Sequence, residues 1–158
     1  MFPALRGVLN KGGAGNYISR EASVERLQPV IADQLDLLRA YDHVAKRISD
    51  PGVRQRMEDV VLPNIRTELN KLYETIFSLG GSAPTGSEMD WTAENLDGSD
   101  AHMLKAMLDR DARFGRSLTE EMDAVHHQER TRAILGHNAA KAEDRSNMLR
   151  ALLADLGR

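Results

Sequence analysis

Four stretches of the chain carry apolar residues three and four positions apart, the spacing of one face of an α-helix. The predicted helices cover about residues 24–49, 51–79, 99–125 and 128–156. Aromatic residues make up only 4% of the chain, whereas Ala, Leu, Met, Arg and Glu are frequent, a composition that favours helix. We therefore expect an all-α four-helix bundle over residues 22–158, preceded by an irregular arm over residues 1–21.

Short signals mark the ends of these helices. Asp50-Pro51 predicts a helix start, with Asp50 as the N-cap and proline at the first helical position. Gly80-Gly81 predicts a helix end in the left-handed conformation. Ser99 or Asp97 is expected to cap the third helix.

Two prolines interrupt the helical pattern. Pro63 lies inside the second predicted helix, where it removes a backbone N–H, so we expect a kink or bulge there. Pro29 is expected at the start or in the first turn of the first helix.

The two halves of the chain repeat the same pattern. A shift of 77 residues places Leu27 on Leu104 and Leu72 on Leu149, so the halves are expected to form equivalent helical hairpins. A helix of about 28 residues is roughly 42 Å long. The connection formed by residues 80–98 can span about 60 Å when extended. It can therefore run the length of the bundle, with Trp91 and Leu96 expected to pin it, and leave the second and third helices parallel.

Composition restricts the classes of function. The chain has 158 residues, enough for one domain, and no cysteine, so thiolate metal ligands and disulfides are excluded. Its net charge is −3, with acidic and basic residues interspersed, which argues against a nucleic-acid surface. No apolar run has the length of a membrane span, and no signal peptide is evident. We expect a cytoplasmic protein that forms a homodimer or a larger homo-oligomer.

Two segments resemble the ferritin-like superfamily, and in particular its small bacterial four-helix-bundle members. They are AYDHVAKRISDPGVRQRM, across the turn between the first two helices, and LYETIFSLGGSAPTG, at the end of the second. The resemblance covers about residues 25–157. It implies two antiparallel hairpins joined by a long crossover. It also implies, in members that act on iron, a carboxylate on the first and third helices and a Glu-x-x-His pair on each of the other two.

The chain contains no Glu-x-x-His sequence. Instead, four polar residues interrupt the apolar stripes near the level where family ligands would lie, and the 77-residue shift pairs Gln34 with Asp111 and Glu68 with Arg145. A register one residue away would make Thr67 and Asp144 the equivalent pair, and the sequence leaves this choice open.

Two interpretations follow. One is a residual metal site, with Glu68, Asp111, Asp144 and Asn147 as ligands and Asn64 in place of Asn147 as a variant. The other, which we favour, is a buried polar network of Gln34, Glu68, Asp111 and Arg145, in which Arg145 supplies the positive charge of a metal. A second, weaker metal candidate lies at the turn between the last two helices. It comprises Asp123, His126, His127 and Glu129.

These observations favour a non-catalytic ferritin-like protein with a degenerate di-iron site, no catalytic residues and no cofactor, acting through self-association or partner binding. The alternative is a divergent iron oxidase or iron-storage protein, with iron or another divalent metal held by a carboxylate-rich site. A third hypothesis is a helical binding module whose arm, residues 1–21, contacts a partner.

Overall fold

The computed structural model describes residues 20–84, 96–125 and 128–157, and within these ranges the chain is helical and contains no strand. Its elements are α2 (Arg20–Arg47), α3 (Pro51–Arg56), the π-helical turn η1 (Met57–Val61), α4 (Leu62–Ser78), α5 (Asp100–Ala124) and α6 (Glu129–Leu156). Because α3, η1 and α4 follow one another without a break, they form one helical arm beside α2, α5 and α6. The prediction of four packed helices is confirmed.

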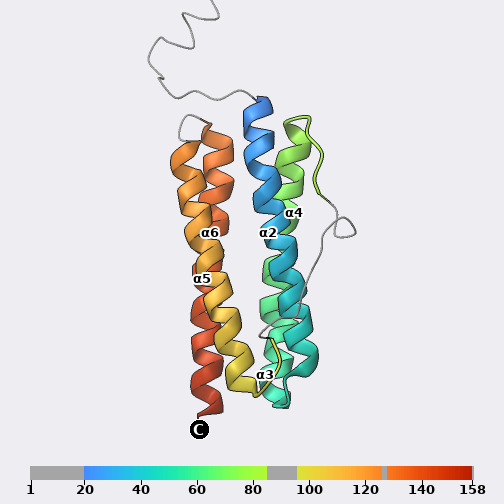
Figure 1. Ribbon diagram of the computed structural model, residues 1–158, viewed down its shortest axis with the longest axis vertical. Coiled ribbons are helices and arrows are strands. Elements are labelled where there is room, and N and C mark those ends of the chain that lie inside the picture. The colour runs from blue at the N-terminus through green and yellow to red at the C-terminus, as the bar shows by residue number, and fades with distance from the viewer. Residues whose placement is uncertain (1–19, 85–95, 126–127, 158) are drawn as a thin grey trace, which may run out of the picture.

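Adjacent helices run in opposite directions. In Figure 1, α2 and α6 descend whereas α4 and α5 rise. The contacts join α2 with α4, α2 with α5, α5 with α6 and α4 with α6, so the parallel pairs lie on the diagonals of the arrangement. Antiparallel neighbours place opposite ends of the helix dipoles side by side, which is favourable.

The connection from α4 to α5 links opposite ends of the molecule. Residues up to Pro84 leave the upper end of α4, and the chain re-enters the description at Leu96, beside the start of α5 at the lower end (Figure 1). Leu96 is completely buried, as expected for a residue that pins this connection. Trp91, the second expected anchor, lies outside the described residues.

Most of the predicted helix ends are found in the structure. Asp50 caps α3 by accepting a hydrogen bond of 2.9 Å from the Val53 N–H. Ser99, and not Asp97, caps α5 through the His102 N–H. Gly80 has φ +80, the left-handed conformation expected after α4.

Both prolines have structural consequences. Pro63 follows the π-helical turn η1, which confirms the expected bulge and fits the loss of one backbone donor at that point. The prediction for Pro29 is wrong, because α2 already begins at Arg20 and Pro29 lies inside it. The irregular arm is therefore shorter than residues 1–21: its last two residues are helical, and residues 1–19 lie outside the described ranges.

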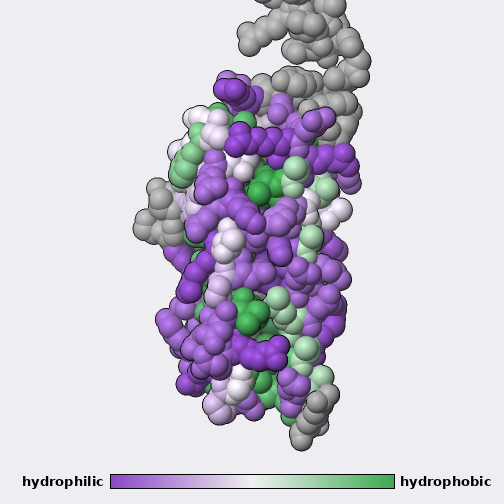
Figure 2. Space-filling view, turned by 180° about the vertical axis from the view of Figure 1, so that it is seen from behind, coloured by the Kyte–Doolittle hydropathy of each residue, from purple (hydrophilic) through white to green (hydrophobic). Residues whose placement is uncertain are grey.

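The core runs along the shared axis of the four arms. Its largest fully buried side chains include Tyr41, Leu27, Ile65 and Leu104, but also the charged Arg145. Hydrophilic residues cover most of the face seen in Figure 2, and apolar residues appear there as small patches. In the described ranges, no helix combines the length and apolar character needed to cross a membrane.

Candidate functional site: a buried polar network

Arg145 on α6 and Asp111 on α5 form a bidentate ion pair inside the molecule. Arg145 Nε donates to Asp111 Oδ2 at 2.8 Å, and Arg145 Nη2 donates to Asp111 Oδ1 at 2.9 Å. Both side chains are 0% exposed. The planar guanidinium matches the planar carboxylate, which makes this the strongest geometry for such a pair. Each charge therefore compensates the other at a place where water cannot solvate either of them.

Two further side chains complete this ion pair. The Tyr41 hydroxyl on α2 donates to Asp111 Oδ2, and Arg145 Nη1 donates to Asn64 Oδ1 on α4 at 3.1 Å. One residue from each of the four helical arms thus meets at a single point of the core. The hydrogen bonds among Tyr41, Asp111 and Arg145 are costly to break because these three side chains are fully buried, with no water to replace a lost partner. Asn64 is half-buried.

The protonation states at this point are held by burial and by neighbouring charge. Burial raises the pKa of Tyr41 well above its usual value, and the Asp111 carboxylate raises it further. Burial alone would lower the pKa of Arg145, but the hydrogen bonds to Asp111 and its charge outweigh burial, so the pKa is raised. Arg145 stays charged and Tyr41 stays protonated at neutral pH.

A second group of polar side chains connects α2, α4 and α6. Asn138 Nδ2 donates to Gln34 Oε1 at 2.7 Å, and Gln34 Nε2 donates to the Ile65 carbonyl at 3.3 Å. Because a backbone carbonyl can only accept, it fixes the orientation of the Gln34 amide and, through it, that of Asn138. Asn138 Oδ1 is left as a buried acceptor with no donor among the described residues.

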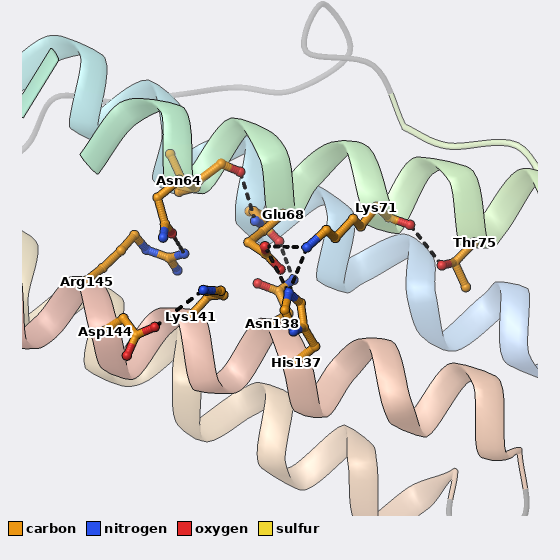
Figure 3. Close-up of polar contacts among 11 residues, drawn as sticks. Asn64, Glu68, Lys71, Thr75, His137, Asn138, Lys141, Asp144 and Arg145 are labelled. Atoms are coloured by element: carbon orange, nitrogen blue, oxygen red, sulfur yellow. Dashed lines mark hydrogen bonds and ion pairs between the residues drawn. The ribbon is translucent and has the colours of Figure 1, made fainter. Parts of the chain in front are cut away.

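Glu68 on α4 faces Asn138 and His137 on α6 (Figure 3). Its Oε1 lies 3.1 Å from Lys71 Nζ and 3.2 Å from His137 Nε2, and Lys71 Nζ lies 2.7 Å from His137 Nε2. The Glu68 side chain is 2% exposed, whereas Lys71 and His137 are 38% and 42% exposed. Glu68 Oε2 has no hydrogen-bond partner among the described residues.

The structure resolves the register left open by the sequence. Gln34, Glu68, Asp111 and Arg145 are all buried, whereas Thr67 is exposed. The partner of Arg145 is Asp111 and not Glu68, which pairs with Lys71 and lies close to His137.

Two of the metal-ligand candidates lie on the outside. Asp144 is 52% exposed and pairs with Lys141 at 3.6 Å. Asn147 is exposed and accepts a hydrogen bond from Arg150 at 3.0 Å. Because both are exposed on α6, they do not lie with the buried Glu68 and Asp111, and the described residues do not form the ligand set of the less favoured interpretation.

The turn between α5 and α6 is described only in part. Asp123 and Glu129 are exposed at the two helix ends, and His126 and His127 lie outside the described residues. Within the described ranges, no group of three or more histidine and acidic side chains is arranged to hold a metal ion.

Sequence reasoning missed four members of these networks. These are Tyr41, whose aromatic ring fits the apolar spacing of the first helix, and Asn138, His137 and Lys71. A signal for one of them was present in the sequence, because Asn138 lies midway between Thr131 and Arg145 at a spacing of seven residues, and all three prove to be buried. A polar repeat of two helical turns on one face predicts polar residues inside a bundle.

We compared the chain with protein-family models, with curated proteins and with solved structures, and none of the three comparisons found a match.

Proposed function

We propose that this protein is a non-catalytic ferritin-like bundle that acts through self-association or partner binding. The arrangement of the helices supports the family assignment. Two antiparallel hairpins, α2 with the α3–α4 arm and α5 with α6, are joined by one connection between opposite ends of the molecule (Figure 1). This is the arrangement of bundles with one long crossover.

One observation is the reason why this proposal includes no metal chemistry. The Arg145 guanidinium lies in the core, bound through two hydrogen bonds to the Asp111 carboxylate. This fixed positive charge repels a metal cation, and its hydrogen bonds occupy the Asp111 oxygens that would bind one.

The residues present do not fit a centre of two metal ions. Such a centre needs several carboxylates that bridge and flank the cations. Asp111 is committed to Arg145 and Tyr41, the first-helix position holds the amide of Gln34, and Glu68 is the remaining buried carboxylate of the described residues. We therefore derive no reaction step through bound iron.

Anaerobic titration with ferrous iron tests this proposal. The protein should bind less than one equivalent tightly. Glu68→Gln and the matched surface variant Asp144→Asn should behave like the wild type, because neither carboxylate belongs to a metal centre. Tight binding of two irons per chain contradicts the proposal.

Self-association is tested separately by sedimentation over a range of concentrations. One chain has a mass of 17.6 kDa. The proposal expects a defined species of at least twice that mass, whereas a constant single-chain mass up to high micromolar concentration contradicts self-association.

The alternative function is a divergent metal-binding oxidase or iron-storage protein, and one specific observation favours it. Glu68 Oε2 and Asn138 Oδ1 are buried acceptors to which no residue in the described part of the chain donates, and oxygen atoms of this kind bind hard cations. Under this alternative, Glu68→Gln should remove iron binding that the wild type and Asp144→Asn both show.

A further inference from the structure

A pocket of about 370 Å³ opens between α4 and α6, beside Glu68. Its lining residues are Lys71 and Thr75 from α4 and Arg130, Ala133, Ile134 and His137 from α6. Three of these six side chains carry nitrogen donors, none carries a carboxylate, and Ala133 and Ile134 form an apolar wall. We propose that this pocket binds a small anion through its carboxylate or phosphate oxygens.

Lys71 has a hydrogen-bond donor left for such a ligand. Its ammonium group has three N–H bonds and no acceptor. One is used by Glu68 Oε1 at 3.1 Å and one by His137 Nε2 at 2.7 Å. No third acceptor for Lys71 Nζ is present among the described residues, and the side chain is 38% exposed. The remaining N–H is available at the pocket.

The contact with Lys71 also fixes the proton of His137. Since an ammonium group can only donate, His137 Nε2 accepts at 2.7 Å, which assigns the ring proton to Nδ1. With this tautomer the 3.2 Å approach of His137 Nε2 to Glu68 Oε1 is not a hydrogen bond, because both atoms accept, and Lys71 lies between the two residues as their shared donor. His137 Nδ1 has no acceptor among the described residues, and the ring is 42% exposed. His137 therefore offers a second N–H donor beside Lys71.

Arg130 supplies the unbalanced positive charge. It lies in the first turn of α6, is exposed, and has no ion-pair partner among the described residues. The charge of Lys71 is offset by Glu68, but that carboxylate is 2% exposed and does not line the pocket. Glu68 thus holds Lys71 in position, and Lys71 in turn holds the His137 ring by donating to its Nε2.

Heteronuclear NMR with two probes, sodium phosphate and sodium butyrate, tests this inference against sodium chloride at matched ionic strength. We expect saturable shifts of the backbone amides of Lys71–Thr75 and Arg130–His137. Saturation by phosphate alone assigns the site to phosphate groups, and saturation by butyrate alone assigns it to carboxylates; either result supports the proposal. Shifts that stay linear with both salts overturn it.

Two arginine variants separate a site from general attraction to positive charge. Arg130→Gln should weaken binding about fivefold or more, because it removes a charged fork-shaped donor. Arg132→Gln removes an exposed arginine of the same helix that does not line the pocket, and should leave the affinity unchanged. Equal weakening by both variants overturns the proposal.

Discussion

Tyr41 on α2 donates its hydroxyl hydrogen to Asp111 on α5, the same carboxylate that Arg145 binds from α6. Asp111 therefore joins three helices through one side chain. The stability of the fold and the neutralisation of the buried Asp111 charge therefore depend on the same few atoms.

Tyr41→Phe should lower the free energy of unfolding by about 1.5–3 kcal/mol, since it removes one buried hydrogen bond to a charged acceptor. Urea denaturation provides the measurement. Tyr73→Phe is the matched control, because the Tyr73 ring stacks on Phe77 at a half-buried position and the loss of its hydroxyl should cost less than about 0.5 kcal/mol. Equal losses of stability in the two variants would show that the Tyr41 hydroxyl stabilises the fold no more than the Tyr73 hydroxyl does.

Arg145→Leu should cost about 3–5 kcal/mol, because it leaves the Asp111 carboxylate buried without a counter-charge. The double variant Asp111→Leu/Arg145→Leu should recover much of that loss, since no charge then remains unpaired. Denaturant unfolding of the three proteins gives both numbers. A cost below about 1 kcal/mol for the single variant would mean that the pair is not desolvated.

Stability should fall at alkaline pH through Tyr41. Its folded pKa is raised above the unfolded value of 10.0, so above about pH 10 the unfolded chain loses a proton that the folded protein keeps. Fewer protons on the unfolded chain mean that the free energy of unfolding decreases with rising pH, by up to about 1.4 kcal/mol per pH unit. The stabilisation is complete below pH 10 and is lost as the pH approaches the folded pKa.

The stability difference between the wild type and Tyr41→Phe measures this effect. It should be constant from pH 7 to 9 and shrink above pH 10. Tyr73, whose pKa is also raised by burial, is present in both proteins and cancels in the difference. A difference that does not change up to pH 11 contradicts the assignment.

Asp100→Ala should destabilise the lower end of the molecule by about 0.5–2 kcal/mol. Asp100 begins α5, and its two carboxylate oxygens accept from the Ser49 and Asp50 N–H groups at 2.8 and 2.9 Å, which joins the turn between α2 and α3 to the start of α5. Asp109→Ala is the control, because Asp109 is exposed and its ion pair is with Arg113 of the same helix. Thermal unfolding of both variants would show whether Asp100 is the more costly loss.

The fold was predictable because its signals are local. Apolar spacing gives each helix, and Asp50, Ser99 and Gly80 mark ends through interactions within a few residues. Pro29 misled the prediction because a single proline on an exposed helix face is tolerated when the surrounding helix is held by packing.

The sequence predicted several of the residues that are buried in the network, but not which of them pair with one another. The sequence indicated that Arg145 would neutralise Glu68 or Asp111, but the choice depends on the rotation and height of three helices. Asp111 lies beside Arg145, whereas Glu68 lies about two turns away along α6, beside His137 and Asn138. Such distances between helices are set by packing, which no local pattern encodes.

The π-helical turn η1 before Pro63 holds one residue more than an α-helical turn would. It keeps Met57 and Val61 in the core before the proline and Ile65 in the core after it. The extra residue is accommodated at the exposed Val60. At this point the chain can therefore lose one residue without moving the apolar side chains of the helix from the core to the surface. Removing Val60 should convert η1 into an ordinary turn and leave the inward faces on both sides of it in phase.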